Sequence, residues 1–321
     1  MKIGNTELEC GLVLAPMAGF SDRGMRVVSH RLGAELSVTE MVSAKAVVYK
    51  DKKTEALARI LEDEGPCALQ IFGSEPEIMA EAAGTLERGV TGGVPPIAID
   101  INMGCPVNKI FSNGEGSALM KNPDLIYKIS SAVSKSISLP LGVKLRLGVD
   151  LGSINAVECA LAAEEGGASF VTVHGRTRVE MYSGNAHLEE IKKVKNSLHI
   201  PLIANGDIVS GESAVRAFEA TGADAIMIGR GAIGNPFVFS EIKARLSGKE
   251  YTPPTLKERV DTALMQLSVA VLEKGERVAV CEARKQIALY VRAFHGAARV
   301  RAEINMATTY SEVESALKGL L

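Results

Sequence analysis

Short apolar segments alternate with longer segments of helical periodicity along most of the chain. Helical spacing is clearest in Asp124–Lys135, Ile154–Glu165, Leu188–Asn196 and Glu212–Ala220. Eight apolar segments have the length of strands: Leu12–Met17, Leu36–Glu40, Cys67–Phe72, Ile97–Asn102, Leu141–Leu147, Phe170–His174, Pro201–Ala204 and Ala225–Ile228. Nearly continuous apolar strands separated by helices are typical of a parallel sheet that helices cover.

Eight such strand–helix units predict an α/β fold, a TIM (β/α)8 barrel, over residues 1–250. A doubly wound open sheet is the competing interpretation, but no Gly-x-Gly-x-x-Gly follows the first strand. The pattern changes after Gly248, where Tyr-Thr-Pro-Pro reads as a linker and Thr255 can cap a helix. Residues 251–321 are almost purely helical in pattern and predict a second, C-terminal helical bundle domain.

The charge is divided unevenly between these two regions. The chain has 321 residues and a formal net charge of −2. Residues 1–250 carry 26 basic and 30 acidic side chains, whereas residues 251–321 carry 10 basic and 8 acidic ones. A nucleic-acid partner would therefore have to meet a local basic patch. The 46% hydrophobic and 23% charged residues exclude disorder and coiled coils.

Five cysteines show neither paired spacing nor a histidine at metal-ligand distance. This pattern predicts no disulfide framework, no metal site and a reducing, cytoplasmic location. The charged start of the chain does not match a signal peptide, and no apolar stretch of about 18 residues exists to span a membrane. We expect a monomer without membrane contact.

Polar residues stand where a barrel strand should be apolar. Lys144 and Arg146 share one face of a strand, since side chains two residues apart point the same way. An unpaired buried cation costs several kcal/mol, so both must meet anions, electron-rich groups or water at the barrel mouth. The alternative is an internal ion pair, for example with Asp100.

The last two strands end in Asn205-Gly206-Asp207 and Gly229-Arg230-Gly231. This region of a TIM barrel commonly binds phosphate, and glycines let backbone N–H groups approach it closely. We therefore predict a phosphate site here. Ordinary turns that need positive φ are the alternative.

Cys105 differs from the other four cysteines, which are expected to be small buried apolar residues. It lies in the loop after the fourth strand, in Asn-Met-Gly-Cys-Pro. A thiol there can act as a nucleophile or a proton donor. No histidine and asparagine complete a triad with it, which disfavours a hydrolase.

Seven segments occur in one order and spacing between residue 10 and about 305: Leu14–Asp22, Gln70–Gly73, Asp100–Pro106, Lys144–Gly148, Val173–Thr177, Ile203–Ile208 and Ile228–Ala232. Together they resemble the tRNA-dihydrouridine synthases, and the bacterial B-type subgroup most. The resemblance implies an FMN-dependent barrel, with NADPH or NADH as reductant, and a C-terminal domain that grips tRNA.

The resemblance also implies a role for each matching position. Cys105 would be the catalytic proton donor, and Asn102, Arg146 and Arg176 would contact the substrate. Gln286 departs from a family segment that often reads Arg-Lys-His, and Asn113 and Glu115 depart from a more basic loop. The residues expected to bind the cofactor are Pro16, Met17, Ala18, Gln70, Lys144, His174, Asn205, Gly206, Asp207, Gly229 and Arg230.

The implied reaction reduces specific uridines in tRNA to 5,6-dihydrouridine. Hydride would pass from flavin N5 to uracil C6, and a proton from Cys105 to C5. One alternative is a flavin barrel that reduces a free pyrimidine, like dihydroorotate dehydrogenase, although a basic helical tail would then have no purpose. Another is an RNA-binding barrel without activity, which an intact Cys105 disfavours.

Six basic residues and one acid lie within residues 277–301. Lys285, Arg292 and Arg299 are seven residues apart, as are Arg277 and Arg284, so each set would follow one line of a helix, which Gly296 can interrupt. A solvated basic face is the alternative. So few acids favour phosphate contact, and we predict RNA contacts at Arg284, Lys285, Arg292 and Arg299.

Overall fold

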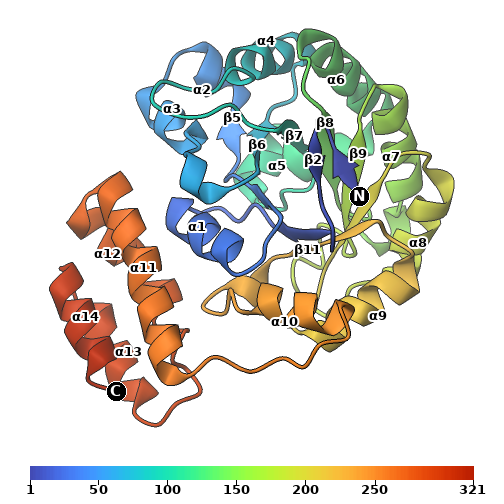
Figure 1. Cartoon of the computed structure of the whole chain (residues 1–321). Helices are drawn as coiled ribbons and strands as arrows, with labels where there is room; N and C mark the ends of the chain where they lie inside the picture. The colour runs from blue at the N-terminus through green and yellow to red at the C-terminus, as the bar shows by residue number, and fades with distance from the viewer.

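A computed structural model describes residues 1–321 and shows a closed barrel of eight parallel strands (Figure 1). Pairing between β4 and β6 closes the ring, so the doubly wound alternative is wrong. A ninth short strand, β5 (Val42–Ser43), continues the path of β4 along β6. The barrel strands are β3 (Leu12–Leu14), β4 (Leu36–Val38), β6 (Cys67–Phe72), β7 (Ala98–Asn102), β8 (Leu141–Leu145), β9 (Phe170–His174), β10 (Leu202–Asn205) and β11 (Ala225–Ile228).

Helices surround the sheet, in the order that the strand–helix alternation predicts. The helix ends lie within about two residues of the predicted ones for all four segments named above. The barrel helices are α1 (Arg23–Arg31), α2 (Ala44–Val48), α3 (Lys52–Ala58), α4 (Pro76–Leu86), α5 (Asn108–Ser112), α6 (Pro123–Ser136), α7 (Ala156–Glu165), α8 (Leu188–Ser197), α9 (Gly211–Thr221) and α10 (Val238–Leu246).

Each strand faces two different cores because its side chains alternate in direction. On β9, Val171 and Val173 join the large outer core between sheet and helices, whereas Phe170 faces the barrel interior. The N-terminal hairpin, β1 (Lys2–Ile3) and β2 (Thr6–Glu7), was not predicted. Ile3 and Leu8 pack into the interior core, so the hairpin covers the amino end of the barrel (Figure 1).

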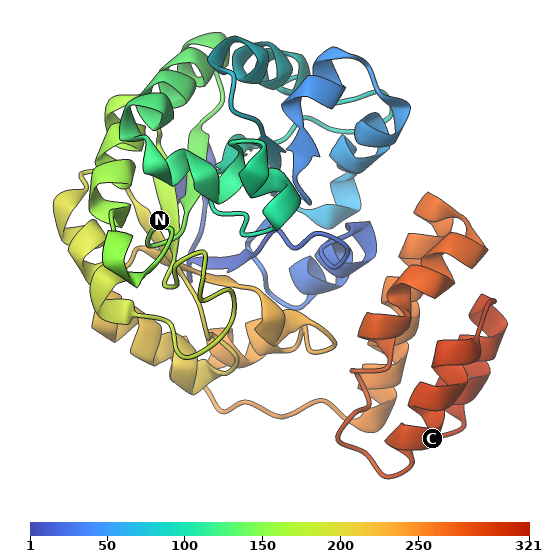
Figure 2. The ribbon, with the colours of Figure 1, turned by 180° about the vertical axis from the view of Figure 1, so that it is seen from behind.

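The C-terminal helices lie beside the barrel (Figure 2). Their apolar side chains form a hydrophobic core of their own. The helices are α11 (Leu256–Lys274), α12 (Glu276–Ile287), α13 (Ala297–Met306) and α14 (Tyr310–Lys318). Thr255 caps α11 through a reciprocal pair with Glu258, as the sequence predicts. None of the helices combines the length and apolar character that crossing a bilayer requires.

Helix α11 of the C-terminal region packs against helix α1 of the barrel. The backbone of Gln266 packs so closely on Gly24 that a side chain could not be added at Gly24. The Lys274 ammonium also lies 2.9 Å from the Asp22 carboxylate, the N-cap of α1. These contacts place α11 beside α1 and the end of the loop that follows β3.

Candidate functional site

The carboxyl ends of neighbouring strands bring polar side chains together inside the barrel. Parallel register pairs Gln70 with Asp100, Asn102 with Lys144, and His174 with Asn205. Residues in register point to the same face of a sheet, so all six side chains face inward. The polar positions found in the sequence therefore form one cluster above the apolar interior core.

Lys144 has no carboxylate partner. Its Nζ donates to Asn205 Oδ1 at 3.3 Å, and no ion pair forms with Asp100. Burial and the charge of Arg146 lower the pKa of Lys144 to about 8, against the opposing charge of Asp100. The ion-pair alternative is thus wrong, and the ammonium is available to an electron-rich group.

His174 is 8% exposed, and its ring nitrogens have no hydrogen-bond partner within the protein. Burial and four surrounding cations lower its pKa well below the usual value. The imidazole is therefore neutral at neutral pH and can donate or accept one hydrogen bond from a ligand.

Cys105 lies in a loop whose backbone is held on both sides. Its N–H donates to Asn102 Oδ1 at 2.9 Å, and its carbonyl accepts from the Ser117 hydroxyl at 2.8 Å. The side chain is 9% exposed, and burial raises the pKa of the thiol. A thiol that keeps its proton at neutral pH suits a proton donor better than a nucleophile.

Arg146 ties three segments of the mouth together. Its guanidinium donates to the carbonyls of Gly104 at 2.9 Å, Thr177 at 2.8 Å and Met181 at 3.0 Å. The side chain is buried, and burial lowers its pKa to about 10. It remains charged at neutral pH and fixes the Cys105 loop against the loop after β9.

Arg176 differs from the expectation that it contacts substrate. It is 1% exposed, and its guanidinium lies 2.7 Å from Asp207 and donates to the carbonyls of Ser183 and Gly184. Asp207 in turn accepts from Arg230 at 3.3 Å. Arg176 thus holds Asp207, and Asp207 orients Arg230 at the mouth.

The loops after β10 and β11 carry unused backbone donors. The N–H groups of Gly206, Asp207 and Gly229 form no hydrogen bond within the protein. Gly206 has φ of +131°, which favours glycine, and a side chain at Gly229 would meet nothing closer than 3.6 Å. Free N–H groups beside a partly exposed arginine are the features of an anion site.

The loop after β3 borders this region. Pro16 begins it, the Met17 N–H donates to the Ser21 hydroxyl at 2.7 Å, and the Ala18 N–H has no acceptor within the protein. The Met17 sulfur lies 3.7 Å from the side-chain position at Gly229. The two loops therefore form neighbouring walls of one mouth.

Tyr182 was missed by the sequence analysis. Its ring centroid lies 4.8 Å from the Arg230 guanidinium, 5.7 Å from that of Arg146 and 6.4 Å from the His174 ring. Tyr182 is half exposed, so an aromatic face is open at the mouth. The available signal was an aromatic residue shortly after His-Gly-Arg-Thr, in a chain with only 4% aromatic residues.

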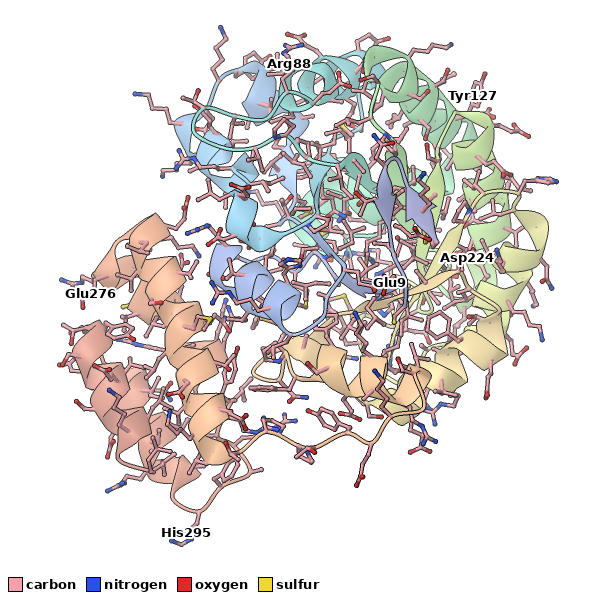
Figure 3. The ribbon with its side chains drawn as sticks, viewed as in Figure 1. Glu9, Arg88, Tyr127, Asp224, Glu276 and His295 are labelled. Atoms are coloured by element: carbon pink, nitrogen blue, oxygen red, sulfur yellow. The ribbon has the colours of Figure 1, made fainter.

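Arg277 and Arg284 share α12, as predicted. Lys285, Arg292 and Arg299 do not follow one helix, so that part of the prediction is wrong. Helix α12 ends at Ile287 and α13 begins at Ala297, after Gly296 at φ of +83°. Arg292 lies between them and Arg299 on the second. The exposed turn carrying His295 is visible at the tip of this region in Figure 3.

These cations also differ in their partners. The Lys285 ammonium lies 4.3 Å from the Phe20 ring centroid, at the loop after β3. Arg284 donates to the Ala307 carbonyl, and Arg299 lies 3.6 Å from Glu303. Arg292 is exposed and has no ion pair. The set is therefore a mixture of fixed and free cations.

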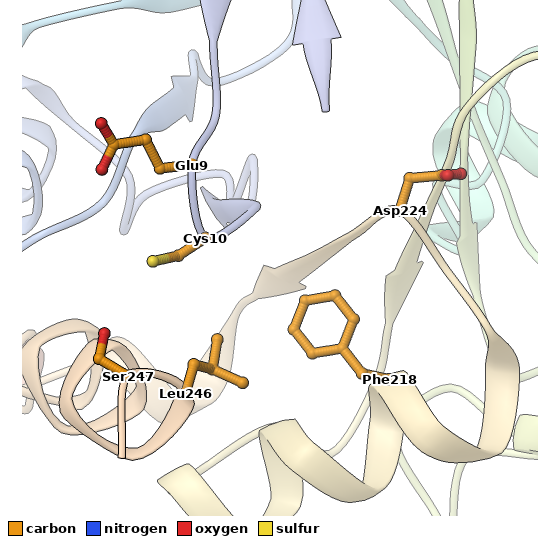
Figure 4. A pocket seen from close by; sticks show the side chains of 6 residues that line it. All are labelled: Glu9, Cys10, Phe218, Asp224, Leu246 and Ser247. Carbon is orange, nitrogen blue, oxygen red and sulfur yellow. The ribbon is translucent and has the colours of Figure 1, made fainter. Parts of the chain in front are cut away.

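Two hollows lie outside the cluster. One of about 340 Å³ contains Glu9, Cys10 and Asp224, which precede the barrel strands and so mark its amino end (Figure 4). The other, of about 310 Å³, lies beside Gly206 and Asp207. No three His, Cys, Asp or Glu side chains are grouped where they could hold a metal ion.

Comparison with known proteins shows the family to which the chain belongs. The family model described as dihydrouridine synthase matches residues 13–320. A probable tRNA-dihydrouridine synthase of Rickettsia conorii is 40% identical over 95% of this chain and 92% of the relative. The tRNA-dihydrouridine synthase B of Pseudomonas aeruginosa is 39% identical over 95% and 91%, and that of Vibrio cholerae is 39% identical over 99% and 98%. The chain belongs to the dihydrouridine synthase family.

Proposed function

We propose that this protein reduces specific uridines in tRNA to 5,6-dihydrouridine, with FMN as resident cofactor and NADPH or NADH as reductant. The observation that carries the proposal is the barrel mouth itself. The mouth carries a partly buried ammonium, a neutral imidazole, free backbone N–H groups and a protonated thiol. The names of the relatives supply the substrate class.

The residues at the mouth fit FMN in three respects. Lys144 has no carboxylate partner and only one long hydrogen bond, to Asn205 Oδ1 at 3.3 Å, and the His174 ring nitrogens have no partner. Both side chains can therefore bond to the carbonyl and ring-nitrogen acceptors of a flavin. The Thr172 hydroxyl, on the same face of β9, is buried without a hydrogen bond. The free N–H groups near Arg230 fit a phosphate.

Specific residues would hold each part of the cofactor. Gln70, Lys144 and His174 would contact the ring, and Pro16, Met17 and Ala18 would line it. The phosphate would lie against Asn205, Gly206, Asp207, Gly229 and Arg230. Bound FMN, once reduced, would supply a hydride for C6 of the uracil ring.

Cys105 would act as the general acid. As C6 gains the hydride, the double bond between C5 and C6 is reduced, and the thiol gives its proton to C5. The resulting thiolate would recover a proton from solvent. Burial favours this role, because it keeps the thiol protonated at neutral pH until the substrate carbon becomes basic.

Other residues would position the substrate. Arg146 holds the Cys105 loop through Gly104 and faces the Tyr182 ring. Arg146 and Asn102 would contact the uracil carbonyl groups. The uridine must leave its stack to reach a mouth at the end of a barrel, as substrates of other base-modifying enzymes do.

Residues 251–321 would form the domain that grips the tRNA. Lys285 reaches the loop after β3, so this region borders the mouth. Arg292 and Arg301 are exposed and unpaired, as phosphate contacts require.

The test uses the purified protein and tRNA from a strain that lacks dihydrouridine synthases. We expect flavin absorbance, release of FMN on denaturation, and dihydrouridine formed with NADPH or NADH. A colourless protein that takes up no FMN, or a flavoprotein that leaves this tRNA unchanged, would contradict the proposal. Cys281→Ala is a suitable control for thiol substitutions, because Cys281 is exposed on α12.

A further inference from the structure

A buried carboxylate, Asp100, has no part in the function described so far. It lies on the inner face of β7 and is 2% exposed. It forms no ion pair, and its one side-chain partner is Gln70, whose Nε2 donates to Asp100 Oδ2 at 2.6 Å. Burying an unpaired carboxylate costs free energy, so we expect Asp100 to serve a role in the site.

A chain of hydrogen bonds leads from Asp100 to the Cys105 loop. Gln70 is fully buried, and its Oε1 accepts from Asn102 Nδ2 at 2.9 Å. Asn102 Oδ1 then accepts from the backbone N–H groups of Gly104 at 3.2 Å and Cys105 at 2.9 Å. Two side-chain amides thus connect a carboxylate to the backbone of the thiol-bearing residue.

Only one orientation of both amides satisfies this chain. A carboxylate accepts but cannot donate, so Gln70 must turn its NH2 group toward Asp100 and its oxygen toward Asn102. Asn102 must then turn its NH2 group toward Gln70 and its oxygen toward the two N–H groups. Reversing either amide would place donor against donor inside the barrel.

We propose that Asp100 is a positioning residue: by fixing the orientation of the Gln70 and Asn102 amides, it holds the Cys105 loop in place and aims an amide donor at the barrel mouth. Each amide has two N–H groups, and one of them is used within the chain. On Asn102, which is partly exposed, the other remains for a ligand. The Asn102 oxygen already accepts from two donors.

The chemistry of the ligand follows from this orientation, and this part rests on the proposed function. Asn102 offers an N–H donor and would select a carbonyl oxygen, which both the isoalloxazine ring and uracil carry. Burial raises the pKa of Asp100 to about 6, against the Gln70 hydrogen bond and the charge of Lys144. The carboxylate is therefore ionised at neutral pH, as an obligate acceptor must be.

The test is Asp100→Asn, which keeps the shape but allows either amide orientation. Its readout is the rate at which iodoacetamide alkylates Cys105, followed by peptide mass at pH 7.5 without tRNA. We expect alkylation about tenfold faster than in the wild type, because the loop loses its fixed anchor. An unchanged rate in a folded Asp100→Asn protein would overturn the proposal.

Ser37→Ala is the matched control. Ser37 is buried on β4 with a hydroxyl that has no partner, and we expect this variant to alkylate at the wild-type rate. Asn102→Ala removes the anchor itself, so adding Asp100→Asn to it should change the rate no further. Independent, multiplying effects of the two changes would contradict a chain that acts through Asn102.

Should Asp100→Asn fail to fold, Asn102→Asp provides the second test. It keeps an acceptor for the Cys105 N–H, replaces the donor to Gln70 with an oxygen, and adds a negative charge. We expect its alkylation to stay within about twofold of the wild type, whereas Asn102→Ala is about tenfold faster. Equal rates for these two variants would overturn the proposal.

Activity then separates this proposal from the proposed function. Asp100→Asn should lower kcat for uridine reduction more than it raises KM, since the thiol and the RNA contacts remain. If wild-type protein does not reduce tRNA, the proposed function fails, while the alkylation rates still decide the role of Asp100.

Discussion

The arginines at the barrel mouth are buried and hydrogen-bonded, whereas some of those on the C-terminal helices are exposed and unpaired. Arg146 and Arg176 are almost fully buried and bonded to backbone carbonyls before any ligand arrives. Arg292 and Arg301 are exposed and unpaired. A buried charge that is already held in place loses little conformational entropy when it binds a small ligand. Exposed, hydrated charges suit a long polyanion, whose binding depends on the salt concentration.

The largest expected effect follows from the loss of Cys105, the proposed proton donor at the mouth. Cys105→Ala should lower uridine reduction by about 10²- to 10⁴-fold, because no other thiol lies there to protonate C5. FMN binding should persist, since the loop is held through backbone groups. Turnover assays beside Cys281→Ala measure this. Near-normal turnover of Cys105→Ala would remove the proton-donor role.

Lys144→Met tests whether the buried charge serves the cofactor. We expect FMN affinity to fall about 10- to 100-fold, because a charged hydrogen-bond donor is lost. Titration of the apoprotein with FMN gives the affinity. Unchanged affinity and activity would show that Lys144 has no ligand.

The pH dependence of the same titration has a definite sign. Lys144 is charged below its pKa of about 8 and neutral above it. FMN affinity of the wild type should therefore be flat below pH 8 and fall above it, by at most about tenfold per pH unit. In Lys144→Met this fall should disappear, and a persistent fall would assign it to another group.

The exposed cations of the C-terminal helices should make tRNA binding depend on the salt concentration. Replacing Lys285 and Arg292 with alanine should weaken tRNA binding about tenfold and reduce the slope of log affinity against log salt by about 1.5. The flavin spectrum should stay normal. Lys318→Ala is the control, because Lys318 is exposed but paired with Glu314. A slope equal to the wild type would mean that this face does not touch RNA.

The smallest effect on binding is expected at Arg284, the neighbour of Lys285. Arg284 donates to the Ala307 carbonyl at the end of α13, so it resembles the fixed cations of the barrel. Arg284→Ala should lower the unfolding free energy by about 1–2 kcal/mol and leave the salt slope unchanged. Thermal unfolding and binding measurements separate the two. A reduced slope would place Arg284 among the RNA contacts.

Much of the barrel could be predicted from the sequence because its strands are apolar on both faces. Cys67–Phe72, Phe170–His174 and Ala225–Ile228 begin and end where the apolar segments do. The inward cluster also followed from residue spacing, since alternation on a strand fixes which side chains share a face. The short N-terminal hairpin gave no such signal, because two-residue strands are too short for periodicity.

Hydrogen-bond partners and helix ends could not be predicted in the same way. Arg176 was expected to contact the substrate, and only the folded loops after β9 and β10 bring Asp207 to it. The predicted line through Lys285, Arg292 and Arg299 is broken because the chain leaves the helix after Ile287. Just after this helix end, the buried Tyr290 hydroxyl donates to Gln266 Oε1 at 2.6 Å. Such tertiary contacts override local spacing.

The proposal that tRNA is the substrate is tested by comparing substrates for the flavin-loaded protein. Unmodified tRNA, free uridine and orotate are each incubated with the protein and NADPH or NADH, and products are quantified by mass spectrometry. We expect uridines in tRNA to gain two hydrogens, at C5 and C6, while the free pyrimidines stay unchanged. Reduction of a free pyrimidine with tRNA left untouched would contradict this proposal.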